Sequence, residues 1–149
     1  MGRIDGQVAL DALVAVFAGK AAVILLAFLL GALGIRFPGG VGSALPALLA
    51  VYWAATRLAR RDRAPMTATE AWVGTGVIAA TVLAIEAGFT AAALTLTGRL
   101  ATVLQDPDVL RILGFSAVVV AVIAIPIIRI LFPLLHQQEL HTLEKKDRG

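Results

Sequence analysis

The sequence contains no cysteine, which excludes several kinds of chemistry at once. Without thiols the chain has no disulfide, no thiolate metal site, no covalent haem attachment and no cysteine nucleophile. Both histidines follow the last long apolar stretch, which argues against a b-type haem held between helices. The sequence therefore predicts no cofactor.

Motifs of the common enzyme classes are also missing. The chain has no phosphate-cradling glycine loop, no HExxH pair and no Ser/His/Asp set at one membrane depth. His136 and His141 are five residues apart, so they do not share a helical face, and no third ligand accompanies them. We therefore expect a protein that is not an enzyme and holds no metal. Residues 136–149, which contain both histidines, are expected to form a solvated cytoplasmic tail.

Charged residues are scarce at 15%, whereas hydrophobic residues reach 59% and the mean hydropathy is +0.89. Soluble domains have an apolar content of about 45 to 50%. Four apolar blocks approach or exceed the roughly 20 residues that span hydrocarbon, at residues 8–35, 41–58, 71–96 and 112–135. The sequence predicts an all-α fold, a single membrane domain over residues 1–149 built as an antiparallel bundle of four transmembrane helices, with the lipid bilayer as its first partner.

The first block is too long for the apolar region of a signal peptide and no cleavage site follows it, so we expect a retained span. Residues 36–40, with Pro38 and two glycines, predict a tight turn that makes the first two spans a hairpin. Thr67 and Glu70 have capping-box spacing before the third block. Asp106 and Asp108 suit turns or helix caps before the fourth.

Lysine and arginine are distributed unequally between the two ends of the spans, and the excess marks the cytoplasmic side. The termini and the second connection carry Arg3, Arg57, Arg60, Arg61, Arg63, Lys145, Lys146 and Arg148, against Arg36, Arg99 and Arg111 on the opposite side. This bias predicts that both termini are cytoplasmic (N-in, C-in). The alanine-rich, arginine-favouring composition is associated with GC-rich bacterial genomes, so we expect a bacterial inner membrane.

Three ionisable residues lie within the apolar blocks: Lys20, Glu86 and Arg129. At about 1.5 Å per residue, Lys20 lies about 15 Å and Glu86 about 22 Å from their cytoplasmic ends, so a lysine side chain can bridge the difference. One interpretation is an interhelical ion pair. The other makes Glu86 a carboxylate that exchanges protons against a cationic substrate. Arg129 lies near the end of its block, and we expect it to snorkel to the interface.

Small residues recur at four-residue spacing in the third block, a pattern that lets another helix approach closely. They are Ala80, Ala84, Gly88 and Ala92. The stripe predicts either a seam within the bundle or a contact between copies in a homo-oligomer.

The densest charge cluster consists of Arg57, Arg60, Arg61 and Arg63. We expect a cytoplasmic basic loop that fixes topology and touches anionic headgroups. Docking of an acidic partner is the alternative. The segment is short and lacks interleaved aromatic residues, so nucleic acid is not an expected partner.

The connection itself contains Arg63, Ala64 and Pro65, followed five residues after the proline by Glu70. This arrangement between a span with aromatic residues and a third helix resembles a family of small uncharacterised bacterial inner-membrane proteins, known mostly by a locus-style label from an Acinetobacter genome. The resemblance covers the second and third spans and implies the overall layout. It implies no reaction, and Lys20, Glu86 and the tail have no counterpart in its pattern.

These observations favour a non-catalytic accessory or structural subunit of a larger inner-membrane complex, with another membrane protein as its partner. The alternative is a small homo-oligomeric, proton-coupled transporter that uses Glu86. Small multidrug carriers also have four spans and one embedded glutamate, but theirs lies in the first span and their chains are shorter.

Overall fold

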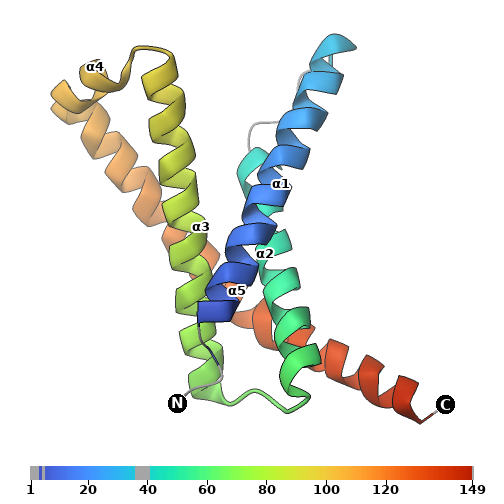
Figure 1. The fold of residues 1–149 in the computed structure, drawn as a ribbon. Helices are drawn as coiled ribbons and strands as arrows, with labels where there is room; N and C mark the ends of the chain where they lie inside the picture. Colours follow the sequence, from blue (N-terminus) through green and yellow to red (C-terminus); the bar gives the residue numbers. More distant parts are fainter. Residues whose placement is uncertain (1–3, 5, 36–40, 149) are drawn as a thin grey trace.

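The structure is a computed structural model of the chain and describes residues 4, 6–35 and 41–148. Within these residues all regular structure is helical, and the long helices alternate in direction (Figure 1). In chain order the helices are α1 (Gly6–Ala32), α2 (Val41–Asp62), α3 (Ala68–Leu96), the short α4 (Leu100–Gln105) and α5 (Pro107–Asp147). The expected all-α fold is confirmed. The predicted turn at residues 36–40 and Arg3 lie outside the described residues.

Three helices in the described part of the chain, α1, α3 and α5, are long and apolar enough to cross a membrane. The fold thus fits a membrane protein. Helix α2 is not one of the three, and its last turns carry Arg57, Arg60, Arg61 and Asp62.

Helix boundaries differ from those expected between the apolar blocks at two places. Helix α2 continues four residues past residue 58, so three of the four arginines assigned to a loop are helical and only Arg63 lies in the connection. Alanine, leucine and arginine favour the helix, and Pro65 disfavours helical backbone at the residue before it. The segment between the third and fourth apolar blocks, residues 97–111, is mostly helical, because α4 fills residues 100–105 and α5 begins at Pro107.

The tail differs most from expectation. Helix α5 runs without interruption through Pro126 and Pro133 to Asp147, so residues 136–147 are not a separate tail. Glutamine, glutamate, leucine and lysine dominate this stretch, and all of them propagate a helix. His136 is fully buried, which corrects the prediction of a wholly solvated tail.

The predicted helix caps are present. Thr67 Oγ1 accepts a hydrogen bond from the Glu70 amide at 3.2 Å, and Glu70 Oε2 accepts one from the Thr67 amide at 2.8 Å. Asp106 Oδ1 accepts hydrogen bonds from the amides of Asp108 and Val109. Each cap satisfies amides that lack a partner within the first helical turn.

The hydrophobic core occupies only the half of the molecule that contains the α2–α3 connection. Helix α1 packs chiefly on α2, and α5 packs on both α2 and α3. Many core residues are alanines, which allow close approach of the helix axes. The fully buried core side chains include Ala12, Val16, Ala50, Ala54, Ala55, Ala59, Ile78 and Phe132.

In the other half, α1 with α2 and α3 with α5 diverge as two arms (Figure 1). In the described residues of α1 burial ends at Val23, in α3 it ends at Ile85, and in α5 it begins only at Ile128. Large apolar side chains therefore face outward on both arms; Phe28 is 74% exposed and Phe115 is 72% exposed. This half can be stable only where apolar surroundings cover these surfaces.

Candidate functional site

The structure brings Lys20 of α1 and Glu86 of α3 together. Lys20 Nζ lies 2.6 Å from Glu86 Oε1 and donates a hydrogen bond to Oε2 at 2.7 Å. The two side chains are 13% and 28% exposed. This is the contact that the ion-pair interpretation expects, and it brings two charges that are costly in an apolar setting within direct reach of each other.

One aromatic ring lies beside the ion pair, and a second ring packs on the first. Lys20 Nζ lies 5.8 Å from the centroid of the Phe89 ring, a distance at which the ring face attracts a cation. The Phe89 ring packs at a tilt on Phe17, with 5.7 Å between centroids. The Phe17–Phe89 contact therefore joins α1 and α3 beside the ion pair.

The chemistry available at this pair is limited to charge and proton exchange. Glu86 Oε1 is fully buried, but the carboxylate side chain as a whole retains its 28% exposure. A bound proton or a cation from the opening between the arms would have to compete with the Lys20 ammonium at 2.6 Å. The geometry thus accommodates both interpretations of Glu86, a fixed ion pair and an exchangeable one.

Arg129 of α5 lies over the indole ring of Trp72 in α3, with its guanidinium carbon 4.9 Å from the ring centroid. Trp72 belongs to the first turns of α3, next to the basic connection. The guanidinium therefore reaches the end of the molecule to which snorkelling would take it, and there it also stacks on a ring that suits the membrane interface.

The four arginines of the predicted basic loop have separate contacts. Arg57 lies over the Trp53 ring at 5.1 Å. Arg60 Nε contacts Glu139 of α5 at 2.7 Å, Arg61 contacts Asp62 at 3.1 Å, and Arg63 contacts Asp147 of α5 at 2.8 Å. The hydrogen bond from Arg60 to Glu139, followed by the charge of Glu139, raises the pKa of Arg60 above its usual value. Two of the four arginines therefore join the end of α5 to α2 and the connection that follows it.

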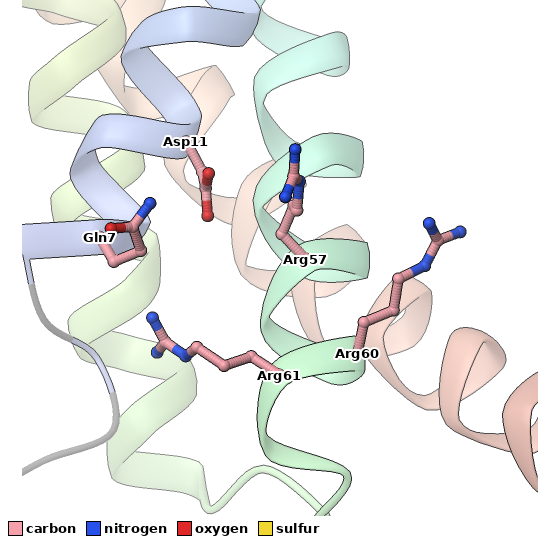
Figure 2. Close-up of a pocket in the computed structure, with 5 residues that line it drawn as sticks. All are labelled: Gln7, Asp11, Arg57, Arg60 and Arg61. Carbon is pink, nitrogen blue, oxygen red and sulfur yellow. The ribbon is translucent and has the colours of Figure 1, made fainter.

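A cleft of about 510 Å³ opens beside this cluster, between α1 and α2. It is lined by Gln7, Asp11, Arg57, Arg60 and Arg61. Figure 2 shows the Asp11 carboxylate pointing into the space between the two helices, with Arg57 across from it and the Arg61 guanidinium reaching beneath Gln7. Arg60 points to the other side of α2 (Figure 2).

Asp11 was visible in the sequence near the start of the first block, but nothing there connects it with the arginines. The cleft arises because α1 and α2 form an antiparallel pair that sets the first turns of one helix beside the last turns of the other. The hairpin predicted for the first two apolar blocks implies that these ends meet, whereas the register that faces Asp11 toward Arg57 comes only from packing.

The residues of the resemblance motif have local structural roles. Arg63 has a positive φ of 49° where the chain leaves α2. Ala64 and Pro65 continue the connection, and Glu70 completes the cap of α3. The positive φ at a residue with a side chain marks a tight reversal.

The small-residue stripe does not form a seam within this chain. Ala80, Ala84, Gly88 and Ala92 are all exposed, and a Cβ atom added at Gly88 would meet nothing within 4 Å. The packed face of α3 instead contains Ala71, Gly74, Thr75, Ile78, Ala79 and Ile85. The intramolecular interpretation is therefore wrong, because the core contacts a different side of this apolar helix.

Metal-ligating side chains do not converge in the part of the chain that the structure describes, where no group of three or more His, Cys, Asp or Glu could hold an ion. His136 is buried in the core end of α5, whereas the His141 side chain is 81% exposed beside Glu144. The two histidines thus face different surroundings, as their spacing predicts.

Gly74 and Phe132 form a close contact that sequence reasoning missed. A Cβ atom at Gly74 would overlap the fully buried Phe132 ring, most severely at Cε1. Glycine here lets α5 cross α3 with an aromatic ring against the α3 backbone. A glycine within an apolar helix was the available signal, although Gly76 and Gly88 carry the same signal without such a contact.

Comparisons of the chain with protein-family models, with curated proteins and with solved structures found no match. The resemblance to the family of small inner-membrane proteins therefore stays a hypothesis.

Proposed function

We propose that this protein is a four-span, N-in/C-in protein of a bacterial inner membrane that serves as a non-catalytic accessory or structural subunit of a larger membrane complex. The observation that carries the proposal is the divergence of the two arms. Beyond the Lys20–Glu86 pair, neither arm covers the apolar surface of the other. A partner helix inserted between them would bury that surface.

The topology is supported by where the charges lie. Both described ends of the chain and the arginine-bearing connection lie at one end of the fold, whereas α4 lies at the other (Figure 1). The positive charges of Arg57, Arg60, Arg61 and Arg63 thus share a side with Lys145, Lys146 and Arg148. Helix α2, at about 1.5 Å per residue, is long enough to serve as the fourth span, with its arginines at headgroup level.

The contact of Glu86 with Lys20 also supports a structural role. The Lys20 ammonium lies 2.6 Å and 2.7 Å from the two carboxylate oxygens, and this ion pair lies where the packed half ends and the arms begin. A fixed contact at this position sets the angle at which the arms present their outer faces.

Native mass analysis of the protein tests the proposal. The chain is tagged at its chromosomal locus, kept at natural abundance and extracted in a gentle detergent. We expect it to comigrate with a large complex at fixed stoichiometry. Recovery as a lone small oligomer would contradict the accessory role.

Variants of α5 locate the partner contact. Phe115 and Val122 are 72% and 65% exposed in the diverging arm, whereas Ile130 is 60% exposed beside the packed half. We expect Phe115→Ala/Val122→Ala to release the protein from the complex, because the truncated side chains lose contact with the partner. Ile130→Ala, an apolar truncation at an exposed position beside the packed half, should leave the complex intact.

A second function is favoured by one observation, the partial exposure of Glu86 at the opening between the arms. A small homo-oligomeric transporter would use this carboxylate to exchange protons against a cationic substrate. In that case Glu86→Asp should alter the pH dependence of transport in vesicles, and Glu86→Gln should abolish transport without unfolding the protein. Retained pH-dependent transport by Glu86→Gln excludes this function.

A further inference from the structure

The cleft between α1 and α2 carries balanced charge. Arg60 is paired with Glu139 and Arg61 with Asp62, so two of the three guanidinium groups already face a carboxylate. The remaining charges are Arg57 and Asp11, one on each wall. A ligand with only negative charge would meet the Asp11 carboxylate in the same space as the arginines.

Asp11 forms no ion pair with the arginines that line the cleft with it, among the described residues. Among ion pairs between described residues, none uses Asp11, although it lines the same cleft as three arginines. The volume of about 510 Å³ lies within the range of small-ligand sites. Opposite charges held apart across such a space suit a ligand that carries both signs.

We propose that this cleft binds a zwitterionic lipid headgroup of the phosphoethanolamine class, with the phosphodiester on Arg57 and the ammonium on Asp11. Guanidinium groups bind phosphate oxygens through paired charge-assisted hydrogen bonds. The first turns of α1 add the positive end of a helix dipole beside Gln7. A primary ammonium donates hydrogen bonds to a carboxylate, whereas the methylated ammonium of choline has no N–H to donate.

The position of the cleft identifies the source of this headgroup as a membrane lipid. The cleft lies beside the basic end of the fold, where Trp53 and Trp72 carry stacked arginines. Indole rings and arginines concentrate at the headgroup level of a bilayer. The inference rests on the membrane placement proposed above and is independent of the partner complex.

Lipid retention by the purified chain tests the site. The protein is inserted in nanodiscs containing equal parts of phosphatidylethanolamine, phosphatidylcholine and phosphatidylglycerol, and the lipids that it retains on release are identified by native mass spectrometry. We expect phosphatidylethanolamine to exceed each of the others by about tenfold, the ratio that one lost charge-assisted contact produces. Enrichment of phosphatidylglycerol, or equal retention of all three, would overturn the proposal without any variant.

Two variants test separately whether Asp11 binds the ammonium and whether Arg57 binds the phosphate. Asp11→Asn should abolish the preference for ethanolamine over choline, and Arg57→Gln should reduce retention of every phosphate-bearing lipid. Asp108→Asn, at the exposed and opposite end of the fold, is the matched control and should leave the ratios unchanged. An unchanged ratio in Asp11→Asn contradicts the role of Asp11.

Two further readouts distinguish a membrane lipid from a soluble ligand and test whether the protein enters a membrane. Soluble glycerophosphoethanolamine should not displace the lipid at equal concentration, and displacement would overturn the lipid assignment in favour of a soluble ligand. A chain that fails to enter the nanodisc contradicts the membrane proposal. A chain that enters and shows no headgroup preference contradicts only the lipid site.

Discussion

The contact between Lys20 and Glu86 offsets the desolvation cost of both charges. Either charge alone among apolar side chains would be unstable, and each is the partner that the other requires. Their residue types and depths predicted that the contact was feasible. The distances of 2.6 Å and 2.7 Å follow from the packing of α1 on α3, which brings the two side chains to the same level.

Exchanging the pair tests its structural role. Lys20→Met or Glu86→Gln should each lower the free energy of unfolding, by about 1 to 3 kcal/mol, because one charge loses its partner in a site only partly open to solvent. The double exchange Lys20→Glu/Glu86→Lys should recover most of this loss. Unfolding in mixed micelles measures the three values. An exchange variant less stable than both single variants would argue against a simple ion pair.

The close contact of Gly74 with Phe132 gives a second prediction at this scale. Gly74→Ala should destabilise the fold by about 1 to 3 kcal/mol, because the methyl group would overlap a ring that is fully buried. Gly76→Ala in the same helix is the control. Nothing lies within 4 Å of a Cβ atom at Gly76, and alanine favours the helix there by up to about 1 kcal/mol. Equal effects of the two substitutions in micelle unfolding would place the Phe132 ring elsewhere.

In α3 the spacing of small residues did not identify the face that packs in the core. The helix is apolar on all sides, so the spacing of small residues marks more than one face. Residues Ala80 and Ala84 lie on the outside, whereas Ala79 is 7% exposed within the core. In an amphipathic helix the polar side would have excluded the wrong face, but in this helix that information is absent.

A larger side chain distinguishes the two faces of α3. Ala79→Leu should destabilise the monomer, because the core has no room for three additional carbon atoms. Ala84→Leu should leave its stability unchanged, because that position is exposed. If the outer stripe is a contact between copies, Ala84→Leu should instead shift the oligomer distribution, which light scattering in detergent detects. Loss of monomer stability in Ala84→Leu would restore the intramolecular seam.

Helix α5 is longer than a membrane requires. Its 41 residues extend about 60 Å at 1.5 Å per residue, roughly twice the thickness of the hydrocarbon core. The C-terminal part therefore continues past the span, and Glu139 and Asp147 contact Arg60 and Arg63 there. Composition predicted helix for this segment, whereas its association with α2 depends on the direction in which α5 leaves the bundle.

For the whole molecule, the main feature is the contrast between a packed half and two diverging arms (Figure 1). The packed half contains the alanine-rich core and the basic cleft. The arms expose apolar residues that need lipid or a partner around them. The proposed four-span, N-in/C-in topology would place these arms within the outer leaflet and the cleft at the inner headgroups.

Cysteine labelling tests this topology cleanly, because the natural chain contains no cysteine. Thr69→Cys and Lys145→Cys should react with a membrane-impermeant maleimide only after cell lysis. Gln105→Cys, exposed at the other end of the fold, should react in intact spheroplasts. The reverse pattern would invert the orientation. Labelling of Thr69→Cys and Gln105→Cys on one side would show that α3 does not cross the membrane.

The sequence by itself determined the all-helical class, the membrane-length apolar helices and the caps at Thr67 and Asp106, because these depend on composition and on residues close in the chain. Tertiary structure decided which face of α3 is buried, where the arms diverge and how Asp11 comes to face Arg57. Those features depend on helix register and crossing geometry. When every side of a helix is apolar, many registers satisfy the same hydrophobic pattern, and only close packing at residues such as Gly74 selects one of them.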